Sequence, residues 1–242
     1  MKMKFHSRPL FSRLPILPTL SLILFLAAPA FAEGQKENYL PPHTPDGIAL
    51  LSPPPAAGSA EQAADLALSE SVVRARTEEE VAQGTKSASL SIFNFAPAIG
   101  DFFQPGKFPK MEHWFNQAKS NTTAAIDLPK EYWKRPRPYE LEKSLLAGKP
   151  ERNASYPSGH SVRGTLQALM LAELFPEKRE AILEYGRKIG WDRVIIGKHF
   201  YTDVVAGRVL AQAIMRELLA NENFKRDLAG VKEEIAAAIK KN

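Results

Sequence analysis

The chain has 242 residues and no cysteine, and 44% of its residues are hydrophobic. This length allows one domain with a sizeable core, and the missing cysteines exclude disulfide scaffolds and thiolate chemistry. The formal net charge is +5, but residues 1–32 hold four basic and no acidic residues, so residues 33–242 carry 28 basic against 27 acidic ones, or +1. This balance does not favour nucleic acid or an anionic membrane surface as a partner.

Residues 1–32 have the pattern of a secretory signal peptide. Four Lys and Arg residues precede an apolar run at residues 20–28, and residues 30–32 read Ala-Phe-Ala. A small-x-small sequence is typical of a cleavage site, so we expect cleavage after Ala32 and a periplasmic or secreted protein. The alternative is an uncleaved anchor, although the apolar run is short beside the roughly 20 residues that a membrane span needs.

Residues 33–58 are rich in proline and predict an extended arm on the surface. Residues 59–242 then form the predicted domain. Ser59 with Gln62, and Thr77 with Glu80, have the spacing of capping boxes that begin helices. Five Phe residues lie among Pro and Gly in residues 85–109, which predicts a packed loop or broken helix that contributes to the core.

The remaining pattern is helical throughout. We expect helices at residues 111–126, from Ser158-Gly159 to about 175, and at 177–189, 199–219 and 224–240. The second of these is apolar nearly all round, which predicts a central position, and its apolar run of ten residues is too short to span a bilayer. No strand pattern competes, so the sequence predicts an all-α, bundle-like single domain.

Three short segments contain most of the residues that could bind a ligand or take part in catalysis. They read Lys130-x6-Arg137-Pro138, Pro157-Ser158-Gly159-His160 and Arg193-x5-His199-x3-Asp203. Cations and N–H donors are what a tetrahedral oxyanion requires, since a phosphoryl transition state spreads charge over three oxygens. We therefore expect Lys130, Arg137 and Arg193 to bind phosphate. The alternative is solvated surface charge, which we keep for Lys134 and Arg135.

The two histidines suit a nucleophile and an acid. His199 and Asp203 are four residues apart, so on a helix they share one face, and the carboxylate can fix the imidazole tautomer. The other ring nitrogen is then a free nucleophile; the alternative is a surface His–Asp pair worth a few tenths of a kcal/mol. Ser158 and Gly159 precede a helix start, where backbone N–H groups hold anions. His160 directly follows Ser158 and Gly159. It either acts as the acid at this site or is a histidine at a helix N-cap with no role in catalysis.

These segments resemble the phosphatidic acid phosphatase type 2 (PAP2) superfamily, which includes vanadium haloperoxidases. The likeness is strongest to the class A bacterial non-specific acid phosphatases, whose signature is Lys-x6-Arg-Pro, Pro-Ser-Gly-His and Ser-Arg-x5-His-x3-Asp. Residues 39–42 (Tyr-Leu-Pro-Pro) and 155–160 extend it. It covers most of the chain after about residue 38 and is loose between about residues 85 and 125.

The resemblance implies roles and one departure. His199 would attack phosphorus and carry a phosphohistidine, Asp203 would orient it, and His160 would protonate the leaving alkoxide. Asp192 stands where the family has a Ser, which the resemblance implies would donate a hydrogen bond near the phosphate. An ionised carboxylate cannot donate, so Asp192 points away, tempers affinity, or is protonated at acidic pH.

The resulting expectation is an acid phosphatase, a phosphoric monoester hydrolase without metal or cofactor. Its substrates would be small phosphate monoesters such as nucleotides and sugar phosphates, and a homodimer is expected from the resemblance. The alternatives are a lipid phosphate or diphosphate phosphatase, a vanadate-dependent haloperoxidase, and a non-catalytic phosphate binder. His160, His199 and Asp203 could supply three zinc ligands, but the nearby cations disfavour a divalent metal.

Overall fold

The computed structural model describes residues 38–239, and within them the chain forms helices and no strand. The all-α prediction is therefore confirmed; the predicted signal peptide lies outside the described residues. The helices are α1 (Gly47–Leu50), α2 (Ala60–Ala75), α3 (Glu78–Lys86), α4 (Ala96–Ile99), α5 (Pro109–Trp133), α6 (Pro138–Leu141), α7 (Gly159–Leu174), α8 (Arg179–Ile195), α9 (Tyr201–Ala220) and α10 (Glu222–Ile239), with short 3-10 helices at Ile92–Phe95, Lys143–Leu145 and Pro176–Lys178.

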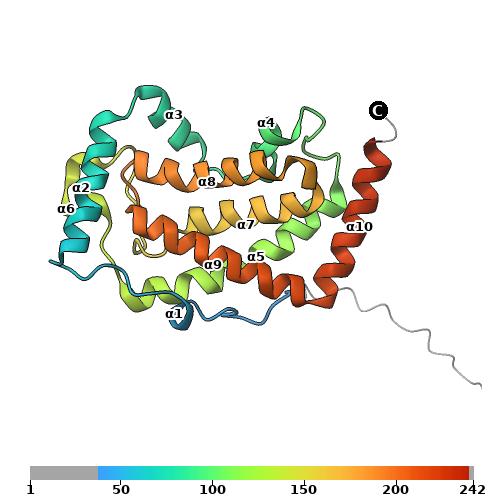
Figure 1. The fold of residues 1–242 in the computed structure, drawn as a ribbon, viewed down its shortest axis with the longest axis horizontal. Coiled ribbons are helices and arrows are strands. Elements are labelled where there is room, and N and C mark those ends of the chain that lie inside the picture. The colour runs from blue at the N-terminus through green and yellow to red at the C-terminus, as the bar shows by residue number, and fades with distance from the viewer. Residues whose placement is uncertain (1–37, 240–242) are drawn as a thin grey trace, which may run out of the picture. The chain divides into compact units, whose positions relative to one another are not determined.

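Helix α7 is the central element, as its apolar composition predicts. It runs between α8 and α9, and α5 packs against it as well (Figure 1). Leu166, Met170 and Leu171 on α7 are buried. Gly186 on α8 lets the two helices approach closely, because a Cβ there would lie 2.5 Å from the Cβ of Ala168. Hydrophobic burial and close packing of this helix thus fix the positions of its neighbours.

The site lies at one end of this helix set. The first residues of α7, the last of α8 and the first of α9 meet there, near α2 and α6 (Figure 1). The chain between α8 and α9 turns sharply at Gly197, which has φ +69°, and a Cβ at this position would lie 2.1 Å from the Leu145 carbonyl oxygen. Only glycine fits both the conformation and the space.

The helix boundaries differ from the expectations where packing extends a helix beyond its local signals. Helices α5 and α8 both run further than predicted, so that Lys130 and Arg193 lie on helices. The two N-caps are confirmed: Ser59 and Thr77 accept from the N–H groups of Gln62 and Glu80. Helix α9 begins only at Tyr201.

The predicted surface arm is partly wrong. Tyr39, Leu40 and Leu51 are buried, and α1 lies within the arm. The Tyr39 hydroxyl donates to Asp227 at 2.7 Å, and its ring meets Phe224 edge-on at 5.2 Å. The arm is thus tied to α10 by an aromatic contact that the proline count does not reveal. None of the described helices is both long and apolar enough to cross a membrane.

Candidate active site

His199 and Asp203 contact each other, but not through helical spacing. His199 lies in the turn before α9, while Asp203 lies in the first turn of that helix. Asp203 Oδ2 accepts from the Phe200 N–H at 2.9 Å and lies 3.3 Å from His199 Nδ1. The expectation that both residues share a helix face is therefore wrong. The carboxylate caps the helix start and meets the imidazole as the chain enters the helix.

The surroundings of His199 define its tautomer. Arg137 Nη1 lies 3.3 Å from His199 Nε2, and a guanidinium can only donate, so Nε2 accepts. The ring proton of the neutral imidazole is then on Nδ1, facing the Asp203 carboxylate at 3.3 Å. The Nε2 lone pair points to the side of the ring where the cations lie. His199 is 2% exposed, so water competes little for this arrangement.

Lys130 and Arg137 lie against the 151–155 segment. Arg137 donates from Nε to the Asn153 carbonyl at 2.9 Å and from Nη2 to the Asn153 side chain at 2.7 Å. Lys130 Nζ donates to the carbonyl oxygens of Ala154 and Ser155. Both side chains are buried, and hydrogen bonds to these acceptors hold the ammonium and guanidinium groups in place.

Arg193 is the third predicted cation. It is fully buried at the end of α8, and its Nη2 lies 2.9 Å from Glu151 Oε1. The same oxygen lies 3.0 Å from Lys198 Nζ. Within residues 38–239, Arg193 Nε and Nη1 have no hydrogen-bond partner. Two donors of a buried guanidinium are thus available to an anion.

Ser158 caps α7, and its side chain accepts from the Ser161 N–H. Gly159 and His160 occupy the first two helical positions, whose N–H groups have no acceptor within the helix. The Ser158 N–H is bonded to the Asp203 carbonyl at 3.0 Å, which holds the α7 start against the α9 start. The His160 Nε2 lies 3.1 Å from the Ala88 carbonyl oxygen.

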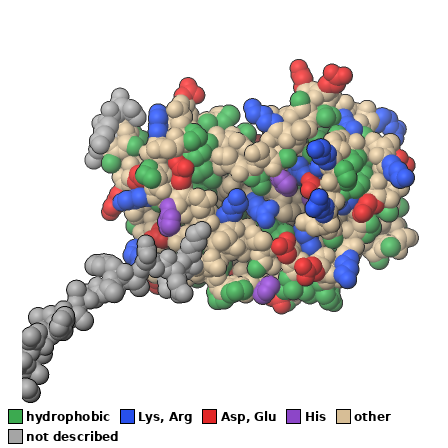
Figure 2. All heavy atoms as spheres, turned by 180° about the vertical axis from the view of Figure 1, so that it is seen from behind, with side chains coloured by type: hydrophobic (Ala, Val, Ile, Leu, Met, Phe, Trp, Pro, Cys, Tyr) green, Lys and Arg blue, Asp and Glu red, His purple; other side chains and the backbone are tan. Residues whose placement is uncertain are grey.

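The electrostatics show that these groups form one cluster. Burial is the main cause that holds the His199 pKa well below its usual range, followed by the charges of Arg137, Lys130, Arg193 and His160. Burial and Arg193 lower the His160 pKa to about 4, and burial and Arg137 lower the Lys130 pKa to about 7. Lys and Arg side chains gather beside a His on the right-hand half of Figure 2, on the side of the molecule where α7 begins and α8 ends in Figure 1. The cluster strongly favours a bound anion.

Comparison with known proteins finds similarity in the region that contains these site residues. The family model described as PAP2 superfamily matches residues 119–226, which include all three segments of the sequence pattern. A non-specific acid phosphatase of Providencia stuartii is 32% identical over 201 residues, which cover 79% of this chain and 81% of that protein. The chain belongs to the PAP2 superfamily.

Two further comparisons found a sequence relative and a similar fold. An acid phosphatase of Zymomonas mobilis is 29% identical over 202 residues, covering 80% of this chain and 76% of that protein. The crystal structure titled as the first transmembrane PAP2 type phosphatidylglycerolphosphate phosphatase, from Bacillus subtilis, superposes with a TM-score of 0.50 at 21% identity, over 70% of this chain and 87% of that one. The latter likeness concerns the fold alone.

The structure adds two residues to this PAP2 site that the sequence interpretation missed. Arg135, expected to be solvated, is 3% exposed. It donates to Asp203 Oδ1 at 2.6 Å and to Asp65 Oδ2 at 2.8 Å, and its Cζ lies 4.1 Å from the Phe200 ring centroid. The Ser155 hydroxyl donates to Asp203 Oδ2 at 2.5 Å. Proline at position 136 predicts a turn here but not the direction of the arginine, whereas Ser155 lies only two residues before the Pro-Ser-Gly-His pattern.

Asp192, the departure from the family signature, is held by its own helix. Its Oδ1 lies 3.0 Å from Lys188 Nζ, one turn earlier on α8, and its side chain is 1% exposed. Lys188 therefore compensates the carboxylate that precedes Arg193. Within residues 38–239, no group of three or more His, Cys, Asp and Glu residues has the arrangement of a metal site.

Proposed function

We propose that this PAP2 enzyme is a metal-independent acid phosphatase that hydrolyses phosphate monoesters through a phosphohistidine at His199. The observation that carries the proposal is the fixed imidazole: Nδ1 faces Asp203, and Nε2 faces Arg137 on the side of the cations. A neutral imidazole with an accepting Nε2 is the form that can attack phosphorus.

The reaction divides into two steps. Nε2 of His199 forms a bond to phosphorus while the ester P–O bond breaks, and protonated His160 gives its proton to the leaving alkoxide. A water molecule then attacks the phosphohistidine, neutral His160 takes its proton, and the P–N bond breaks to release phosphate. Lys130, Arg137, Arg193 and the N–H groups of Gly159 and His160 would hold the three equatorial oxygens in both steps.

The lowered pKa values of His160 and Lys130 support a coupling between substrate binding and protonation. In the ligand-free enzyme the His160 pKa is about 4, so the imidazole is neutral at pH 6. A phosphate dianion placed beside it raises this pKa and favours the protonated acid, while Lys130, with a pKa of about 7, is already mostly protonated at pH 6. We expect activity in the acid range, where His160 can be protonated, because burial and the charges of Arg137 and Lys130 favour the neutral form of His199.

Substrate range, location and assembly are further parts of the proposal. The proposed contacts all hold the phosphoryl group, which favours a broad set of small esters such as nucleotides and sugar phosphates. The sequence of residues 1–32 favours export to the periplasm or the medium, which cell fractionation tests. The resemblance favours a homodimer, which analytical ultracentrifugation tests.

The direct test is hydrolysis of p-nitrophenyl phosphate in EDTA from pH 4 to 8. His199→Ala is compared with wild type and with His113→Ala, an exposed histidine of α5 that serves as the matched control. Turnover at acidic pH that survives EDTA, is lost in His199→Ala and is kept in His113→Ala is expected. Activity that EDTA abolishes and a divalent metal restores would overturn the metal-free mechanism, and no turnover at any pH would favour a lipid substrate, haloperoxidase chemistry or simple binding.

A further inference from the structure

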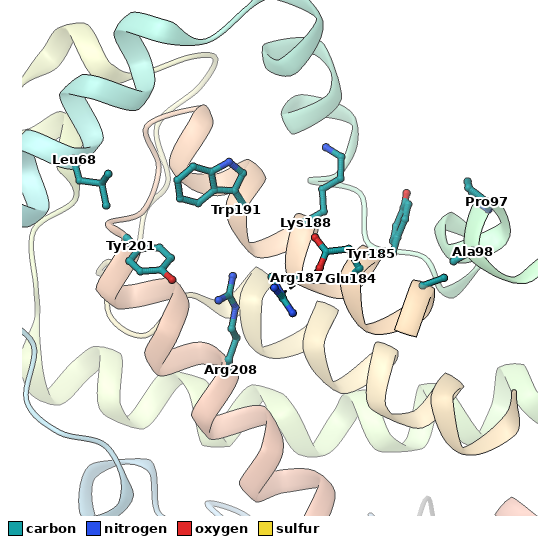
Figure 3. Close-up of a pocket in the computed structure, with 11 residues that line it drawn as sticks. Leu68, Pro97, Ala98, Glu184, Tyr185, Arg187, Lys188, Trp191, Tyr201 and Arg208 are labelled. Atoms are coloured by element: carbon teal, nitrogen blue, oxygen red, sulfur yellow. Dashed lines mark ion pairs between the residues drawn. The ribbon is translucent and has the colours of Figure 1, made fainter. Parts of the chain in front are cut away.

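A large cavity lies outside the proposed phosphate site. It has a volume of about 820 Å³, it is bounded by α2, α4, α8 and α9, and none of its lining residues belongs to the set proposed above. Figure 3 shows that its side chains are sorted along the cavity, with rings at each end and charged groups between them. This volume suits a small molecule of drug-like size.

One end of the cavity is an aromatic wall. Trp191 on α8 and Tyr201 on α9 meet with ring centroids 5.9 Å apart and an interplanar angle of 79°. Leu68 of α2 lies beside them and is 36% exposed (Figure 3). Because Trp191 and Tyr201 are only half-buried, each leaves ring surface open to the cavity. Such surface binds a flat apolar body by stacking and burial.

The middle of the cavity is cationic. Arg187, Lys188 and Arg208 line it, and Glu184 is the one carboxylate among the lining residues. Glu184 lies 3.4 Å from Arg187 Nε, and Lys188 shares its charge with Asp192. Arg208 has its Cζ 5.9 Å from the Tyr201 ring centroid, and its buried Nε has no hydrogen-bond partner within residues 38–239.

We propose that this cavity is a binding site for an aromatic anion. The ring would stack against Trp191 and Tyr201, and the anionic group would face Arg208 and Arg187. An aliphatic anion would match the charges but lose the stacking, and a neutral aromatic would match the rings but leave Arg208 without an anionic partner. Lys188 also pairs with Asp192, but no residue proposed to contact the phosphoryl group lines the cavity, so the inference does not depend on the proposed function.

The test uses naphthalene-2-sulfonate, an aromatic anion that has no phosphoryl group to hydrolyse. Binding is measured by isothermal titration calorimetry in saturating inorganic phosphate, which occupies the proposed phosphate site. Octane-1-sulfonate and 2-naphthalenemethanol are the aliphatic and neutral comparisons. The variants are Arg208→Gln, Arg187→Gln and Trp191→Leu. Arg226→Gln is the matched control, because Arg226 lines a different cavity beside α10.

We expect one site per chain, about tenfold weaker binding in Arg208→Gln, and weaker binding in Trp191→Leu for the naphthalene probe but not for octane-1-sulfonate. Arg226→Gln should bind as wild type does. Equal affinity for both sulfonates with no effect of Trp191→Leu would refute the aromatic preference. Binding that is absent, or unchanged in both Arg208→Gln and Arg187→Gln, would refute the site itself. If Trp191→Leu fails to fold, the comparison of the three probes on wild type decides the preference.

Discussion

The substitution Asp203→Asn tests how the structure sets the tautomer of His199. Both carboxylate oxygens act only as acceptors: Oδ1 from Arg135, and Oδ2 from the Phe200 N–H, the Ser155 hydroxyl and His199 Nδ1. An amide of the same shape has only one acceptor oxygen. Whichever way it turns, its NH2 group faces at least one donor.

The amide should keep its oxygen toward the Arg135 cation, so that its NH2 faces the imidazole. His199 would then carry its proton on Nε2, the nitrogen that faces the Arg137 guanidinium. A protonated Nε2 has no free lone pair and cannot attack phosphorus. The loss combines a charge-assisted hydrogen bond of roughly 1.5–3 kcal/mol with an unpaired buried donor of roughly 1–3 kcal/mol. We therefore expect kcat to fall by about 10²–10⁴-fold.

The assay is steady-state hydrolysis of p-nitrophenyl phosphate across pH 4–8, with urea unfolding to check that the variant is folded. Asp65→Asn is the matched control, since Asp65 also accepts from Arg135 but makes no contact with His199. It should lose stability and keep most of its kcat when folded. A folded Asp203→Asn enzyme with kcat within tenfold of wild type would refute the tautomer argument.

Three further results are expected. In urea titrations, Arg135→Gln should lower the free energy of unfolding by about 3–5 kcal/mol, because two buried carboxylates lose their cation. Lys134 is exposed, so Lys134→Gln should change the same free energy by less than about 0.5 kcal/mol. The folded-state pKa of His160 is about 4, so as pH falls from about 6.5 to 4 the unfolded chain takes up a proton at this residue before the folded protein does, and the folded protein loses stability. The melting temperature of His160→Gln should therefore fall less than that of wild type over this range. An equal fall in both proteins would contradict the assignment. Asp192→Ser should lower the inhibition constant for inorganic phosphate by about tenfold with little change in kcat, since one negative charge beside the site is removed, and Lys188→Gln should raise it.

The sequence predicted the parts of the fold that local chemistry determines. The caps at Ser59 and Thr77 and the start of α7 after Ser158 all follow from side chains that bond their own backbone. The central place of α7 follows from its composition. The ends of α5 and α8 do not, because tertiary packing extends these helices through Lys130 and Arg193 without a local signal.

The environment of each site residue was less predictable than its identity. Spacing suggested that His199 and Asp203 share a helix face, whereas the contact comes from a glycine turn that enters α9. Arg135 looked like surface charge because its partners, Asp65 and Asp203, are 70 and 68 residues away. A buried ion pair between distant segments leaves no periodic trace, so only the fold reveals it.

The phosphohistidine itself is the most direct measure of the mechanism. Enzyme mixed with a ³²P-labelled phosphate monoester and quenched within milliseconds should carry label that is stable in alkali and labile in acid, and peptide mapping should place it on His199. His160→Gln should accumulate label with an activated aryl ester, because the second step lacks its base. Label on another residue, or full turnover with no trapped phosphoenzyme at any quench time, would contradict the account.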